Sequence, residues 1–228
     1  MRQCLATGPY IPGDRISMSE SGGDPGCHWR DPGPGGHSYG AFQFTTGQHK
    51  PGCAQGSSLE AFLQSDLGAP FARQGLDPAR AGSDEFTDLW RQVADADPTA
   101  FKEAQREFVW RHYIDAAIGD RLKRLKLDIR ARSCALQELV MHLTLAAPAL
   151  AKTALRKVAE KHNGDLSDVD DAILLKELHQ VRSRPNPKVE GGLFYWRRNS
   201  PRIQRNVRRA NEEEYQDLVL LLELEVGP

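Results

Sequence analysis

Residues 19–26 of the chain read Ser-Glu-Ser-Gly-Gly-Asp-Pro-Gly, and residues 35–43 read Gly-Gly-His-Ser-Tyr-Gly-Ala-Phe-Gln. A short helix is predicted over residues 14–20, with Asp14 as its N-terminal cap and Gly22-Gly23 as its end. Over residues 37–45, polar and apolar residues alternate weakly and aromatic side chains are frequent, which predicts an extended strand or one arm of a hairpin. A helix end, a loop and a hairpin therefore follow one another within 30 residues.

Glycine and proline divide the rest of the chain unevenly. The first 56 of the 228 residues hold 12 Gly and 6 Pro, whereas all later residues together hold 16. The first quarter is therefore expected to be rich in loops, and the remainder is expected to be mostly helical. The predicted organisation is a single domain over residues 1–228, with a glycine- and proline-rich lobe over 1–56 and a helical lobe over 57–228.

Beyond residue 56, apolar side chains recur at helical spacing. Residues 134–145 are apolar on nearly all sides, which is typical of a buried central helix. Further helices are predicted from Ser57, over 83–96, from Pro98 through Ile114, and over 149–162, 168–181 and 211–224. About eight helices around the central one, with a small N-terminal β-hairpin lobe, indicate a mainly α architecture of the α+β kind.

Composition excludes several classes of protein. Hydrophobic residues make up 39% of the chain and charged residues 27%, which is ordinary for a soluble globular protein. No apolar run is long enough to span a bilayer. The 30 Lys and Arg against 31 Asp and Glu give a net charge of −1, which argues against a dedicated nucleic-acid binder.

One segment departs from this balance. Residues 182–209 hold nine Lys or Arg and a single acid, Glu190, with Phe194, Tyr195 and Trp196 among them. Alone, this pattern suggests a nucleic-acid surface. Attraction to an anionic cell-wall polymer explains it equally well, as does a solvated basic helix face.

Glu20 is the leading candidate for chemistry. It lies at the C-terminal end of the predicted helix, where the helix dipole disfavours a charged carboxylate, and a general acid must hold its proton at neutral pH. The two glycines after it allow a sharp turn and close approach of a ligand. A second carboxylate, Asp31, follows 11 residues later. Paired carboxylates are the standard equipment for cleaving a glycosidic bond.

The surrounding side chains suit a sugar substrate. Aromatic rings can supply flat faces for sugar rings, and polar side chains can hydrogen-bond hydroxyl or N-acetyl groups. The aromatic candidates are Trp29, Tyr39 and Phe42. The polar candidates are His37, Ser38 and Gln43. Asp24, in a second Asp-Pro pair, competes with Asp31 for the role of second carboxylate.

The pattern Glu-Ser-Gly-Gly, followed by Gly-Gly-x-Ser-Tyr-Gly-Ala-Phe-Gln, resembles the lysozyme-like superfamily. It is closest to phage endolysins, bacterial cell-wall hydrolases and glycoside hydrolase effectors of type VI secretion, and more distantly similar to bacterial chitosanases. The resemblance implies that Glu20 is the general acid and that Asp31 occupies the position of the second carboxylate in chitosanase-like members. Phe101, Gln105, Phe108, His112 and Tyr113 also resemble a helix found in these proteins.

The expected function is therefore that of a muramidase, which cleaves the β-1,4 bond between N-acetylmuramic acid and N-acetylglucosamine in peptidoglycan. The enzymatic alternatives are a lytic transglycosylase, a chitinase and a chitosanase. The non-enzymatic alternative is a cell-wall-glycan-binding protein of the same fold. The expected partners are peptidoglycan strands and an immunity protein that plugs the cleft, with no nucleic acid and no membrane span. No cofactor is expected, although the resemblance leaves room for a calcium ion.

Compartment and redox state follow from the N-terminus and the cysteines. The first 15 residues have no apolar core, so we expect no signal peptide. The expected route is synthesis in the cytoplasm and action in the periplasm or cell wall, after delivery by secretion machinery or a holin. Of the four cysteines, Cys27 and Cys53 form the first disulfide to consider, and four free thiols are the equal alternative.

Overall fold

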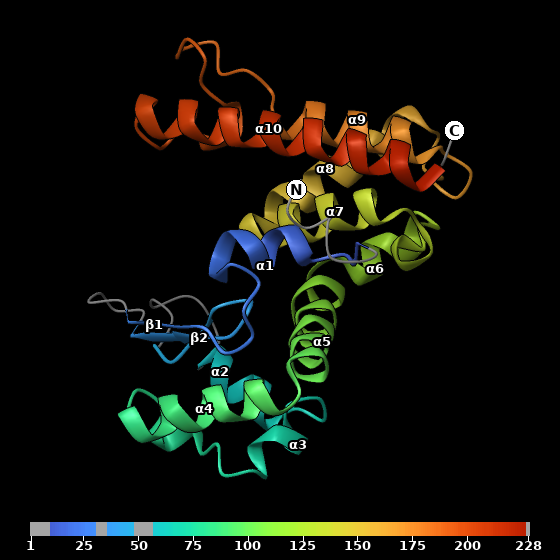
Figure 1. Cartoon of the computed structure of the whole chain (residues 1–228). Helices are drawn as coiled ribbons and strands as arrows, with labels where there is room; N and C mark the ends of the chain where they lie inside the picture. Colours follow the sequence, from blue (N-terminus) through green and yellow to red (C-terminus); the bar gives the residue numbers. More distant parts are fainter. Residues whose placement is uncertain (1–9, 31–35, 48–56, 227–228) are drawn as a thin grey trace. The chain divides into compact units, whose positions relative to one another are not determined.

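The computed structural model describes residues 10–30, 36–47 and 57–226. These residues form two compact units (Figure 1): an N-terminal unit, Gly13–Tyr113, and a C-terminal unit that runs from Ile114 and takes in residues 10–12. Helices dominate both units, and the one sheet of the described residues has three short strands, so the predicted mainly α fold is confirmed. The first unit combines the glycine-rich segment with the helices up to residue 113. The single-domain organisation stays a prediction.

The N-terminal unit holds a helix, the sheet and four further helices. The first helix is α1 (Asp14–Ser21), and the antiparallel sheet has the order β1 (His28–Arg30), β2 (His37–Tyr39), β3 (Phe44–Thr45). The other helices are α2 (Ser58–Gln64), α3 (Ala69–Ala72), α4 (Asp84–Ala96) and α5 (Pro98–Val109), with a 3₁₀ turn over Pro78–Arg80. Residues 37–45, predicted as an extended strand or one arm of a hairpin, form both arms, β2 and β3, with a turn between them.

Helix α1 begins and ends where the sequence predicts, but its cap differs. Gly13 is the N-terminal cap, and Gly22 ends the helix in the left-handed region at φ 69°. The carboxylate of Asp14 does not cap the helix. It accepts hydrogen bonds from Lys102 Nζ and Arg106 Nη2, both at 3.0 Å, so it ties the start of α1 to α5.

An aromatic core holds the small sheet in place. Phe44 of β3 stacks on Phe62 of α2 with ring centroids 5.0 Å apart, and Phe108 of α5 meets both rings edge-on. Trp90 of α4 is fully buried and donates from its indole nitrogen to the carbonyl of Pro25 at 2.9 Å. Burial of several large rings explains how such short strands are stable.

The described residues of the C-terminal unit form helices and one isolated antiparallel bridge, between Pro185 and Leu193. A π-helical segment, Trp110–Asp115, crosses the boundary between the units. The α-helices that follow are α6 (Ala116–Arg124), α7 (Cys134–Ala146), α8 (Pro148–Lys161), α9 (Asp171–Arg182) and α10 (Pro201–Val226), with 3₁₀ turns over Ile129–Ala131 and Phe194–Trp196. Helix α7 packs against α8, α9 and α10, and Leu136 and Leu139 are fully buried. The predicted buried central helix is confirmed.

Helix α10 begins at Pro201, ten residues before the predicted start. The predicted start was too late because apolar residues recur at helical spacing only in the second half of the helix. The first half carries exposed arginines instead. Asp170 caps α9 by accepting from the N–H of Ala172 at 2.8 Å. None of the helices in the described residues has the length and apolar character needed to cross a membrane.

Candidate functional site

Glu20 is exposed on the last turn of α1. Two left-handed glycines follow it, Gly22 at φ 69° and Gly23 at φ 80°, and they turn the chain sharply away from the helix. The amide of Gly23 donates to the carbonyl of Ser17 at 3.0 Å, and that of Gly22 to Met18 at 3.1 Å, which closes the helix end. The carboxylate therefore lies at a hydrogen-bonded helix terminus and is exposed to solvent.

Contacts from distant parts of the N-terminal unit fix this terminus. Ser21, the neighbour of Glu20, donates from its hydroxyl to the carbonyl of Ala41 at 3.0 Å. Gln105 of α5 is fully buried, and its Oε1 accepts from the Ala41 amide at 2.8 Å. The same side chain donates to the Pro25 carbonyl at 3.3 Å. One buried amide thus joins the loop after α1 to the turn after β2, and Ser21 connects that turn to the backbone of the acid.

Gly40 has to be glycine for two separate reasons. Its φ of +83° lies in the left-handed region, and a Cβ there would lie 2.4 Å from Gln105 Oε1. Gly40→Ala is expected to lower the free energy of unfolding by at least about 2 kcal/mol, because it adds a clash to the strain. Gly22→Ala is the matched control, since it has φ +69° and no atom within 4 Å. It should lose only about 1 kcal/mol. Equal losses in urea titrations would show that Gln105 does not constrain this turn.

The sheet separates the predicted sugar-binding side chains onto two faces. Trp29 is 64% exposed and pairs across the strands with Ser38, so both lie on one face. Tyr39 lies on the other face and is fully buried, with its hydroxyl 3.0 Å from both Thr87 Oγ1 and the Gly82 amide. The predicted role of Tyr39 as a flat face for a sugar is therefore wrong: its ring belongs to the core. Trp29 remains available for stacking.

His37 forms a close pair with a histidine that the sequence prediction did not include. Its Nδ1 lies 2.8 Å from His28 Nε2, and the two rings stack with centroids 5.1 Å apart. Burial, followed by the neighbouring His37, lowers the pKa of His28 below its usual range. The contact requires one nitrogen to donate and the other to accept, so at least one of the two rings is neutral.

Phe42 and Gln43 lie in the turn between β2 and β3, and both are half-buried. Gln43 has φ 53° and donates from Nε2 to the Gly40 carbonyl at 3.0 Å, so its side chain stabilises the turn. Its predicted hydrogen bonds to substrate stay a prediction.

Two residues compete for the role of second carboxylate, Asp31 and Asp24. Asp31 lies outside the described residues. Its rival, Asp24, is exposed and accepts the Gly26 amide at 2.7 Å, which is the turn-forming use of an aspartate before proline.

The described residues contain no cluster of three His, Cys, Asp or Glu that could hold a metal ion. Cys27 is a free thiol, and its predicted partner, Cys53, lies outside the described residues. Burial and the nearby Asp24 raise the pKa of the Cys27 thiol.

Residues 17–214 match a protein family that is described as the C-terminal region of VgrG3-like spike proteins of the type VI secretion system. The chain belongs to this family. The match includes Glu20, the sheet and most of both compact units, and it ends within α10. The expected relation to type VI secretion is thereby confirmed for this VgrG3-like chain. No curated protein matches it.

Sequence reasoning missed the supporting role of Gln105 in this VgrG3-like chain. The residue was part of the helix resemblance, but its bonds go to backbone groups 64 and 80 positions earlier. A signal was present: Gln105 lies between Phe101 and Phe108 on the buried face of α5. A polar residue on such a face needs a hydrogen-bond partner, and here the partner is the loop beside the candidate acid.

Proposed function

We propose that this VgrG3-like chain is a peptidoglycan hydrolase of the muramidase type, with Glu20 as its general acid. The placement of Glu20 carries this proposal. An exposed carboxylate lies at the end of a helix, two left-handed glycines turn the chain after it, and a buried amide fixes the adjoining turn. General acid catalysis needs a carboxyl group that is both accessible and held in position.

In the proposed reaction, Glu20 gives its proton to the glycosidic oxygen as the bond to the sugar breaks. Water then adds to the anomeric carbon, and a second carboxylate takes up the proton that this water loses. Asp31 is proposed for that role. The exposed indole of Trp29, on β1, offers a flat face for a sugar ring. A carboxyl separation of about 6.5–9.5 Å would favour inversion, and about 5 Å would favour retention.

The type VI family supports a matching biological setting. We propose that the chain is delivered by secretion machinery to the cell wall of a competing bacterium. The immunity partner expected from the sequence would protect the producing cell by blocking the site around Glu20.

Mass spectrometry of purified peptidoglycan digested by the protein tests the function. The expected products are muropeptides with reducing N-acetylmuramic acid ends. Anhydro ends would identify a lytic transglycosylase instead, in which the sugar supplies its own nucleophile and Asp31 is dispensable. Cleavage of chitin or chitosan alone would move the substrate to those polymers. No cleavage of any of these polymers would overturn the enzyme assignment and favour a glycan-binding role.

A further inference from the structure

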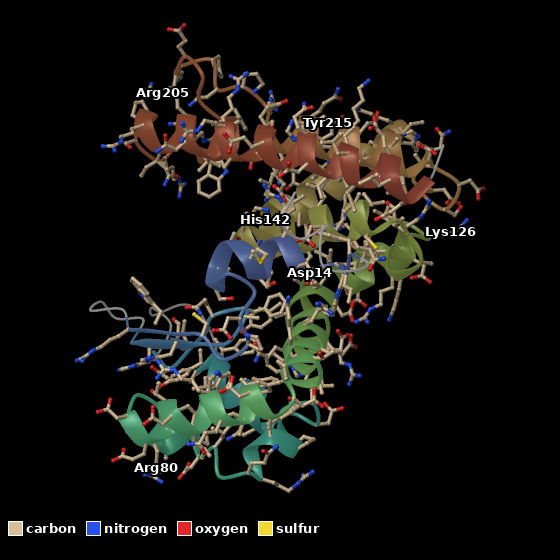
Figure 2. The ribbon with its side chains drawn as sticks, viewed as in Figure 1. Asp14, Arg80, Lys126, His142, Arg205 and Tyr215 are labelled. Atoms are coloured by element: carbon tan, nitrogen blue, oxygen red, sulfur yellow. The ribbon has the colours of Figure 1, made fainter. Side chains whose placement is uncertain are left out.

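The C-terminal unit carries a dense cationic surface that the proposed catalysis does not use. Eight exposed cations occur within residues 184–209, against one exposed acid, Glu190. We call this set the basic surface: Arg184, Lys188, Arg197, Arg198, Arg202, Arg205, Arg208 and Arg209. Arg205 marks it near the N-terminal end of α10 in Figure 2. On α10, Arg202, Arg205 and Arg209 are spaced as neighbours along one face of the helix.

The positive charge of this surface is not neutralised locally. Within the described ranges, Arg209 is its one member in an ion pair, with Glu213 at 3.8 Å. Arg184 and Arg197 instead lie over the ring of Phe194, with guanidinium carbons 4.5 and 5.0 Å from its centroid. Uncompensated cations on one patch create a positive potential that attracts polyanions.

The loop that bears half of these cations is fixed to α10. Gln204 is 1% exposed; its Oε1 accepts from Asn186 Nδ2 at 2.9 Å, and its Nε2 donates to the Asn199 carbonyl at 2.8 Å. The Phe194 amide donates to the Arg184 carbonyl at 2.9 Å and closes the loop on itself. The basic surface is therefore preorganised, which reduces the entropy lost on binding.

A pocket opens beside the same loop. Its volume is about 420 Å³, and it is lined by the rings of Tyr195 and Trp196, the side chains of Asn199 and Thr153, and alanines at the junction of α7 and α8. Apolar walls with a few amide and hydroxyl groups are typical of a small-molecule subsite. Two rings beside polar side chains suit a sugar unit. Arg197 and Arg198 follow directly in the chain and can pair with carboxylates.

We propose that the basic surface and this pocket bind a carboxylate-bearing glycan, with one sugar unit in the pocket and the arginines on its anionic groups. In such a glycan, the sugar rings can contact the aromatic side chains and the carboxylates can pair with the arginines. The inference rests on the proposed function, because peptidoglycan is such a polymer, but binding here requires no catalysis.

The test measures binding by the full chain in a Glu20→Gln background, so that the probe stays intact. Probes are purified peptidoglycan sacculi, soluble polygalacturonate, neutral dextran and a single-stranded DNA 20-mer. One variant combines Arg202→Gln, Arg205→Gln and Arg209→Gln. The matched control combines Lys123→Gln, Arg124→Gln and Lys176→Gln, which removes the same charge from exposed positions outside the basic surface.

The α10 variant should bind sacculi and polygalacturonate about tenfold more weakly than the control, and dextran should not bind detectably. Trp196→Ala should weaken sacculus binding about three- to tenfold. Equal affinities for the α10 variant and its control would overturn the proposal. DNA binding tighter than polygalacturonate binding would assign the surface to nucleic acid instead. Residual cleavage by Glu20→Gln would contradict only the catalytic proposal, because polygalacturonate binding would still be measurable.

Discussion

Glu20→Gln should lower the rate of peptidoglycan cleavage by about 10²–10⁴-fold, the usual contribution of a general acid. The amide keeps the size and hydrogen-bonding capacity of the carboxyl group but has no proton to transfer. Because the side chain is exposed, stability should change by no more than about 0.5 kcal/mol. The release of soluble muropeptides over time gives the rate, and a urea titration gives the stability.

Matched variants make this result specific. Glu60→Gln changes another exposed glutamate of the same unit, on α2, and should cleave at the wild-type rate. Asp31→Asn and Asp24→Asn, assayed alongside, decide between the two candidates for the second carboxylate. Cleavage by Glu20→Gln within threefold of wild type would remove Glu20 from the mechanism.

Glu214→Ala should cost about 3–5 kcal/mol of unfolding free energy, the usual loss when one partner of a buried ion pair is removed. Glu214 of α10 is 1% exposed, and its two oxygens contact Arg182 Nη1 of α9 and, at 2.6 Å, His142 Nδ1 of α7. Three helices of the C-terminal unit thus meet at one carboxylate, and His142 and Tyr215 mark this region in Figure 2. Without that carboxylate, the Arg182 guanidinium is left buried with an unpaired charge.

Glu213 provides the control, because it is adjacent on α10 but has a largely exposed side chain. Glu213→Ala should change stability by less than about 0.5 kcal/mol. Replacing both buried partners, as Arg182→Met with Glu214→Leu, should recover part of the loss because no unpaired charge remains. A loss under 1 kcal/mol for Glu214→Ala would show that Glu214 is not essential to this helix packing.

The sequence predicted helices more reliably than strands. Helix α7 was recognisable because apolar residues occupy nearly all its sides, and such a helix must be surrounded by others. Strand β1 was missed, since its three residues, His28–Arg30, carry no alternation. The first half of α10 was missed for a related reason: its exposed arginines have no apolar period, although they extend a helix readily.

Only part of the candidate site could be predicted, because some of its features are determined by neighbouring residues and others by distant ones. Glu20 could be placed at a helix end because the glycines that terminate α1 follow one residue later, after Ser21. The burial of Tyr39 could not be read locally, because Phe86 and Trp90 of α4 cover its ring. An aromatic residue in a glycine-rich hairpin gives the same local pattern whether its ring faces solvent or core.

The long-range bonds of Gln105 have a consequence for the order of events during synthesis. The turn and loop beside Glu20 are held by side chains of α4 and α5, which the ribosome adds 64 or more positions later. Contacts this distant along the chain form late, because a large loop must close before they are made. A nascent chain that ends before α5 therefore carries the acid without its support. The Glu20 carboxylate, the proposed general acid, therefore reaches its position only when the whole N-terminal unit folds.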